Sequence, residues 1–352
     1  MTPHPQPNLA HLVRLSDELG IVEHARRDEP ARDLGYCTDD AGRLLGVLSA
    51  MRDDAAAAGL CDIALAFLED ASDGERGFRL RRRADRTWTD DPRSDDATGR
   101  ALEGLGIAVA RATHPLVRER ALTLFERSAT WRSHYRRSMS HAALGALSVL
   151  EVMPEHPAAH ALVVDASRVL ARFDAPDGSP WPEPRLYYAN ALIPDARLAL
   201  AHARGDARGV DDALTMLDWL AREESLDDHF SFTPTHGREL SGVRPDFDQQ
   251  PIEAWAMADA CTRAYRVTGD PRWAARVALA RSWFDGNNDV GVNVGDPATG
   301  AGYDGLESTG VNANQGAEST LAFVATVLRS DEIRRALGVD LVPQLATASI
   351  AP

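Results

Sequence analysis

Apolar residues recur at helical spacing over most of the chain, and polar or proline-containing segments separate these runs. The periodicity predicts twelve helices, over residues 9–27, 38–52, 55–71, 95–113, 116–132, 142–152, 158–173, 187–204, 209–223, 251–268, 271–284 and 314–328. Thr38 or Asp39 is a candidate N-cap of the second helix, and Ser138 or Ser140 of the sixth. A polar start followed by an apolar run recurs at intervals of several tens of residues, which is typical of a repeated helical unit.

The segments between the helices differ greatly in length. Residues 77–89 alternate loosely and predict a small hairpin or extended flap. Residues 174–185, 225–249 and 286–311 form long irregular stretches with many Pro, Gly, Asn or Asp residues, which favour loops. We expect a single domain over 9–329, a disordered N-terminus over 1–8 and a C-terminal tail over 330–352.

The even-numbered helices share a feature that the odd-numbered helices lack, because each begins with polar or acidic residues. These starts are Asp39 and Asp40, Asp95 and Asp96, Ser138 to His141, Tyr187 to Asn190, Gln249 to Glu253, and Asn314 to Glu318. The pattern predicts an all-α fold, an (α/α)6 toroid of six helical hairpins. In such a toroid six inner helices run parallel, their N-terminal ends line one concave face, and long loops form the walls of that face.

The composition narrows the class of protein. Hydrophobic content of 44% with only 6% aromatic residues fits a helical protein, and a net charge of -15 argues against a nucleic-acid partner. The chain contains no lysine, which excludes a lysine Schiff base, pyridoxal phosphate and a P-loop lysine. Three scattered cysteines, no signal segment and no apolar run of about 18 residues predict a cytoplasmic protein without a membrane span.

The paired acids are the first candidates for chemistry. Asp40 and Asp96 each follow another Asp at a helix start, and Arg43 and Arg100 lie one turn further on. One acid suffices as an N-cap, worth about 0.5 to 2 kcal/mol, so the arginine can hold the second carboxylate. For any single acid, capping alone remains the alternative.

The segment before residue 256 combines acids, amides and an aromatic ring. Asp248, Gln249 and Gln250 precede a helix that contains Glu253 and Trp255 in its first turns. A sugar pocket needs such hydroxyl partners, a carboxyl that transfers a proton and an apolar ring platform. The alternative is a proline-started helix with a capping Asp, a solvated Glu and a core Trp.

Two further segments carry similar residue types. Glu318 follows Asn314 and Gln315 and begins a helix that is apolar from 321 to 328. Burial there would raise the pKa of Glu318 towards the range of a general acid, whereas an exposed glutamate in the first turn is the alternative. Residues 181–190 contain Glu183, Tyr188 and Asn190 on a proline-rich loop, which suits a substrate wall or a structural plug.

The chain has no pattern typical of a metal or cofactor site. His229 and His236 have no histidine or glutamate partner at ligand spacing. Residues 285–296 begin like a calcium loop but lack the required glycine at position six and the glutamate at position twelve. We therefore predict neither a bound metal nor a cofactor.

Five segments carry a resemblance to a known family: 35–40, 96–102, 188–194, 248–254 and 314–321. Through them the chain resembles the six-hairpin glycosidase superfamily, and more narrowly a bacterial helical domain often fused to or encoded beside glycosyltransferases. It departs from that domain at Ala41-Gly42-Arg43, where Asn-Ala-Arg is usual, and it carries no glycosyltransferase half. The resemblance implies the toroid fold, carbohydrate chemistry and a functional link to a glycosyltransferase.

These observations predict a glycoside hydrolase that acts on the end of an oligosaccharide or polysaccharide with inversion. One carboxyl would protonate the leaving oxygen and a second would activate water. The candidate acid is Glu253 or Glu318, and the candidate base is Asp40 or Asp96. Candidate substrate-binding residues are Asp39, Asp95, Arg43, Arg100, Glu183, Tyr188, Asn190, Asp248, Gln249, Gln250, Trp255, Asn314 and Gln315.

Three other functions suit the same toroid. A sugar epimerase or isomerase would use paired histidines, and only His141 lies at an inner-helix start. A lyase would need a Tyr or His base beside a group that neutralises a uronate, for which Tyr187, Tyr188 and Arg185 are available. A non-catalytic carbohydrate-binding or scaffolding partner of a glycosyltransferase is the third alternative.

Overall fold

The computed structural model describes residues 6–51, 54–89, 94–171, 178–240 and 242–338. Of the N-terminal segment 1–8 that we expect to be disordered, residues 1–5 lie outside the described residues. Most of the expected C-terminal tail also lies outside them. The helices are α1 Ala10–Leu15, α2 Thr38–Ser49, α3 Ala55–Ala71, α4 Asp95–Arg111, α5 Pro115–Ser128, α6 Arg136–Val152, α7 Pro157–Leu170, α8 Leu192–Ala203, α9 Ala207–Glu223, α10 Pro251–Thr268, α11 Pro271–Phe284 and α12 Ala317–Leu337.

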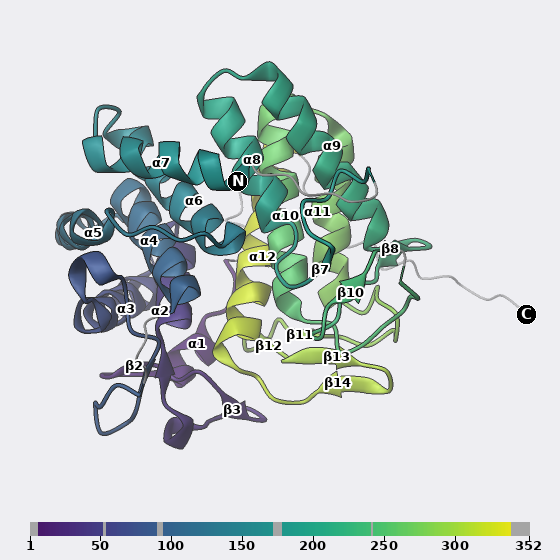
Figure 1. Ribbon diagram of the computed structural model, residues 1–352. Coiled ribbons are helices and arrows are strands. Elements are labelled where there is room, and N and C mark those ends of the chain that lie inside the picture. Colours follow the sequence, from purple (N-terminus) through teal and green to yellow (C-terminus); the bar gives the residue numbers. More distant parts are fainter. Residues whose placement is uncertain (1–5, 52–53, 90–93, 172–177, 241, 339–352) are drawn as a thin grey trace, which may run out of the picture.

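The even-numbered helices form a closed ring. Each packs on the next, from α2 through α4, α6, α8 and α10 to α12, and α12 packs back on α2. The odd-numbered helices α3 to α11 each cover the inner helix before them, and α1 covers α12 (Figure 1). This arrangement confirms the predicted (α/α)6 toroid. None of the helices in the described residues is long and apolar enough to cross a membrane.

All described strands precede inner helices and pair as two-stranded antiparallel ladders. The pairs are β1 Ser16–Asp17 with β2 Gly20–Ile21, β3 Ala25–Arg26 with β4 Glu29–Pro30, β5 Tyr36–Cys37 with β6 Arg81–Arg82, β7 Arg185–Leu186 with β10 Arg238–Glu239, β8 Ser225–Leu226 with β9 His229–Phe230, β11 Gly295–Asp296 with β12 Ala301–Gly302, and β13 Gly305–Glu307 with β14 Gly310–Asn312. In Figure 1 most of them gather below the ring, around the start of α12. The long segments thus lie at the N-terminal ends of the inner helices, as predicted.

The predicted flap over 77–89 is a hairpin. Arg82 forms a bridge with Trp88, and the Arg83 N–H donates to the Thr87 carbonyl oxygen at 2.9 Å. The strand β6 in this hairpin also pairs with β5, next to the start of α2.

The predicted helix over 9–27 is wrong beyond Leu15. The chain forms β1 to β4 there, because the Asp17 side chain accepts from the Leu19 N–H at 2.9 Å and Gly20 has φ 149°. Similarly, the predicted helix over 187–204 begins only at Leu192, because Ala189 takes a positive φ of 45°. Such local turns are invisible to a 3.6-residue periodicity.

The predicted N-caps are also corrected. Cys37 caps α2 without a side-chain hydrogen bond, while the Thr38 hydroxyl donates to the Arg79 carbonyl oxygen at 2.6 Å. The helix α6 begins at Arg136, so Ser138 and Ser140 lie inside it. At the other end of the chain, α12 continues to Leu337, beyond the expected end at 328.

Glycines let the backbones of α2, α4 and α6 touch. A Cβ on Gly106 would lie 2.0 Å from the Gly145 carbonyl oxygen, and a Cβ on Gly104 would lie 2.2 Å from the Gly42 carbonyl oxygen. Backbone atoms cannot move aside as the end of a side chain can. These contacts therefore fix the spacing of the first three inner helices.

We expect Gly106→Ala to destabilise the fold by about 1 to 3 kcal/mol, the usual cost of overpacking. Gly59→Ala is the matched control, because Gly59 lies in α3 with nothing within 4 Å of an added Cβ. The control should be neutral or stabilise by up to about 1 kcal/mol. Urea unfolding of both variants measures the difference, and equal stabilities would contradict the close packing.

Candidate functional site

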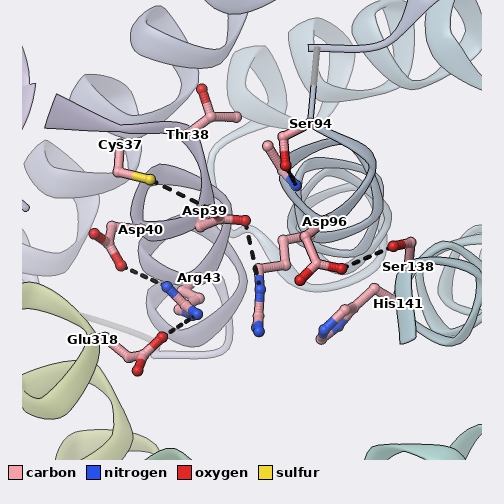
Figure 2. Close-up of polar contacts among 12 residues, drawn as sticks. Cys37, Thr38, Asp39, Asp40, Arg43, Ser94, Asp96, Ser138, His141 and Glu318 are labelled. Carbon is pink, nitrogen blue, oxygen red and sulfur yellow. Dashed lines mark hydrogen bonds and ion pairs between the residues drawn. The ribbon is translucent and has the colours of Figure 1, made fainter. Parts of the chain in front are cut away.

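One arginine joins two inner helices where the ring closes. Arg43 on α2 donates from Nη1 to the Asp40 carboxylate at 2.6 Å, and its Nη2 donates to the carboxylate of Glu318 on α12. Asp40 and Arg43 are buried, whereas the Glu318 side chain is 36% exposed. Figure 2 shows the guanidinium between the two carboxylates. Glu318 is therefore the member of this group that solvent or a ligand can reach.

The two Asp pairs divide their contacts between neighbouring helices. The Asp39 carboxylate lies 3.6 Å from Arg100 Nε on α4, so Arg100 holds an acid of α2 and not one of its own helix. Asp96 accepts from the Ser138 hydroxyl at 2.8 Å, and Asp95 accepts from the Ser133 hydroxyl at 2.7 Å. The predicted arginine–carboxylate pairing thus exists, but for Arg100 it runs between helices.

Burial changes the protonation of this group. It raises the pKa of Asp40 to about 7, although the neighbouring Arg43 acts in the opposite direction. Glu23 and Glu318 raise that pKa further. Burial also raises the pKa of Asp304, which accepts from the Gly316 N–H at 2.7 Å. Asp40 and Asp304 therefore retain their protons to higher pH than ordinary carboxyls.

Buried His141 forms a pair with the partly buried Glu103, a residue that the sequence analysis did not identify. His141 Nδ1 lies 2.5 Å from Glu103 Oε2, and His141 Nε2 has no hydrogen-bond partner among the described residues. Burial, with a further contribution from Arg100, lowers the pKa of His141, and burial raises that of Glu103 to about 7. Glu103 lies one turn after Arg100, and this spacing is the signal that could have identified it.

Glu253 is buried beneath the chain that leads into α8. Its carboxylate accepts from the N–H groups of Ala189 and Asn190, the latter at 3.1 Å, and from Asn190 Nδ2 at 3.3 Å. Burial and the neighbouring Glu224 raise its pKa to about 8. The structure therefore places Glu253 and Asn190 in a buried anchor of the α8 start.

Arg137 on α6 organises the neighbouring loop and was also missed. Its Nη1 donates to the Glu183 carboxylate at 2.8 Å, its Nη2 donates to Asn190 Oδ1 at 3.1 Å, and its guanidinium lies 5.3 Å from the Tyr188 ring centre. Trp181 on the same loop is fully buried and stacks on Trp219. The loop is thus held mainly by contacts with the rest of the protein.

The remaining predicted residues have different surroundings. Gln249 is fully buried, where its Oε1 accepts from the Phe232 N–H at 3.1 Å and its Nε2 donates to Asp289 at 2.6 Å. Asn314 Oδ1 accepts from the Arg27 N–H at 2.9 Å. Among the other predicted binding residues, the side chain of Asp248 is exposed, and the side chains of Gln250, Trp255 and Gln315 are partly buried.

A cavity of about 290 Å³ runs along the axis of the ring. Near the helix starts it is lined by buried Arg43, Arg100 and His141. At the other end it is lined by exposed residues in the last turns of inner helices, among them Arg111 and Arg266. The cavity therefore opens at the C-terminal ends of the inner helices.

The four predicted catalytic carboxyls lie outside this axial cavity. Asp40, Asp96, Glu253 and Glu318 are absent from its lining, whereas Trp255 contributes to it. Asp40, Asp96 and Glu318 lie together at the helix starts (Figure 2). With Asp39, Arg43 and Arg100 they form a group that we call the carboxylate cluster. The cluster and the cavity meet at Arg43 and Arg100.

Solved structures share this architecture over nearly the whole chain. A sugar epimerase from a ruminal bacterium has a TM-score of 0.70 and 12% identity over 95% of this chain and 96% of that chain. Cellobiose 2-epimerase from Spirochaeta thermophila DSM 6192 has a TM-score of 0.65 and 13% identity over 93% of this chain and 94% of that chain. The GH76 α-mannanase BT2949 from Bacteroides thetaiotaomicron has a TM-score of 0.65 and 11% identity over 94% of this chain and 95% of that chain. These similarities show that the chain has the (α/α)6 toroid fold.

No protein-family model matches the sequence, and no curated protein matches it. At identities of 11 to 13%, the structural similarity concerns the fold. The solved structures of this fold include two epimerases and a mannanase, so the fold alone does not identify a reaction.

The raised pKa of Asp40 makes stability depend on pH. Folding raises this pKa from 3.8 to about 7, so as pH rises the unfolded chain loses the proton first. The contribution to stability is greatest below pH 4 and falls as pH rises towards 7, by at most about 1.4 kcal/mol per pH unit. Urea unfolding of Asp40→Asn should show a smaller fall over this range than the wild type. Asp211→Asn, at an exposed site on α9, should leave the fall unchanged.

Proposed function

We propose that this protein is a glycoside hydrolase that removes sugar from the end of an oligosaccharide or polysaccharide at the N-terminal face of its toroid. One observation carries the proposal. Carboxyls of the carboxylate cluster come together from three inner helices, with Asp40 and Glu318 around Arg43 and Asp96 held by Ser138 beyond the Asp39–Arg100 pair (Figure 2). Paired carboxyls that flank a bond are what glycoside hydrolysis requires.

Glu318 is the proposed general acid and Asp96 the proposed base. Glu318 is given the acid role because its carboxyl is the partly exposed one beside Arg43, where a bound sugar can reach it. Asp96 is held by the Ser138 hydroxyl on the far side, where it would activate water. Inversion requires room for that water, with carboxyls roughly 6.5 to 9.5 Å apart.

Asp40, Arg43 and Glu253 have positioning roles in this proposal. Arg43, fixed by Asp40, orients the Glu318 carboxylate. Glu253 fixes Ala189 and Asn190, next to the partly buried Tyr188 that would contact the sugar. The segments that resemble domains beside glycosyltransferases support a glycan made by such an enzyme as the substrate.

We expect Glu318→Gln and Asp96→Asn each to reduce turnover of the cleaved oligosaccharide by about 100-fold or more, the usual share of a general acid or base. Reducing-end release from an oligosaccharide panel measures turnover. Glu119→Gln, an exposed residue of α5, is the matched control and should retain wild-type activity. Wild-type turnover in both cluster variants would contradict the assignment.

A second candidate is a sugar epimerase or isomerase. The specific observation in its favour is the His141–Glu103 pair, because both residues line the axial cavity. The solved structures of similar fold include proteins described as a sugar epimerase and a cellobiose 2-epimerase. However, epimerisation by paired histidines would need a second histidine, and within the described residues His141 is the single histidine in the cavity lining.

The same panel separates the two reactions. If the protein is an epimerase, the product sugars will be isomers of the substrate. His141→Asn will then reduce the rate of their formation by about 100-fold or more. If it is a hydrolase, shorter sugars will appear instead. Chromatography of the products on a column that resolves epimers distinguishes these results.

A further inference from the structure

We propose that the axial cavity is a second binding site, which takes one neutral, sugar-sized molecule from the C-terminal ends of the inner helices. This site faces away from the carboxylate cluster. The inference is independent of the proposed hydrolysis, because it depends only on the shape and lining of the cavity.

The exposure of the lining shows that the cavity is a blind hole with its mouth on the far face. Ala189 and Ile252, like Arg43 and His141, are buried at the closed end. Halfway along, the side chains of Arg263 and Arg329 are 30% and 33% exposed. The volume of about 290 Å³ is near the lower end of small-molecule pockets, roughly 300 to 1,000 Å³. A single sugar ring suits this size better than a chain.

Three arginines along the walls are each paired with a carboxylate of the lining. Arg263 donates from Nε to the Asp195 carboxylate at 2.5 Å, and Arg329 donates to the Asp259 carboxylate. Nearer the mouth, Arg266 donates to Glu332 at 2.5 Å. Because each of these cations has its own anion, the walls favour a neutral ligand over phosphate or a metal ion.

These ion pairs present donors and acceptors side by side. A guanidinium offers several N–H donors and a carboxylate offers several lone pairs, so an adjacent pair can bind two neighbouring hydroxyls. Between the pairs, partly buried Trp255 and buried Leu144 and Leu192 supply apolar surface. A molecule with both hydroxyls and an apolar ring face matches this combination.

Two buried polar atoms in the lining lack partners among the described residues. Thr262 is 1% exposed and His141 is 5% exposed, and neither Thr262 Oγ1 nor His141 Nε2 has a hydrogen-bond partner among the described residues. Buried polar groups of this kind are almost always paired. A ligand hydroxyl at the inner part of the cavity would supply the missing partner.

Isothermal titration of the full chain with glucose, mannose, galactose and inorganic phosphate tests the inference. We expect at least one hexose to bind and phosphate not to bind. Thr262→Val should weaken hexose binding about tenfold, because one hydrogen bond is lost. Its melting temperature should be unchanged or higher, because the lost hydroxyl is unpaired. Thr262→Ser keeps the hydroxyl and should retain wild-type affinity.

Two further variants locate the bound sugar. Ala325→Leu should abolish binding, because Ala325 lines the cavity from α12 and a larger side chain fills it. Glu318→Gln, in the carboxylate cluster, should leave hexose binding in the cavity intact even if it abolishes hydrolysis. Failure of hydrolysis and failure of this inference are therefore separate results.

Three results would overturn the inference. The first is the absence of heat with all three hexoses, and the second is binding of phosphate in their place. The third is hexose binding that Thr262→Val and Ala325→Leu leave unchanged while Glu318→Gln removes it, because the sugar would then occupy the cluster face.

Discussion

The buried guanidinium of Arg43 is the interaction on which the closed ring and the carboxylate cluster both depend. A cation held away from water is tolerated only when anions pair with it. Asp40, on the same helix, supplies one anion, and Glu318 on the last inner helix supplies the other. The pairing therefore brings the first and last inner helices together and sets the position of Glu318, the more exposed of the two carboxyls.

The rest of the ring is packed by two different means. Between α2, α4 and α6, glycines such as Gly106 and Gly145 allow backbone contact. Between α8 and α11 the core contains large aromatic side chains, including Trp273 and Trp283. The anchor formed by Glu253 lies in this second half and fixes the chain before α8. One side of the toroid is thus set by close backbones, and the other by bulky side chains and a buried carboxyl.

The sequence was sufficient to predict the bounds of the helices whose ends carry strong local signals. The predicted spans 55–71, 251–268 and 271–284 agree with α3, α10 and α11, because Asp54 caps α3 and proline starts the other two. The first helix was overestimated because turns such as that at Asp17 to Gly20 interrupt an apolar periodicity that continues beyond them. Alternation of inner and outer helices followed from the polar starts, and the ring confirms it.

The site was less predictable, because its contacts join helices that are distant in sequence. The arginine one turn after an Asp pair is a local pattern, and Arg43 with Asp40 follows it. Arg100 has the same spacing but pairs with Asp39 on another helix. Gln249 has the composition of a binding residue yet is buried in a structural network. The direction in which the axial cavity opens depends on side-chain size along six helices at once, which no single segment encodes.

The closure of the ring by its last helix has a consequence for synthesis of the protein. Because α12 packs on α1, α2 and α10, the apolar edges of these early and late helices stay uncovered until residues beyond Ala317 leave the ribosome. The ring therefore cannot close before α12 has been synthesised.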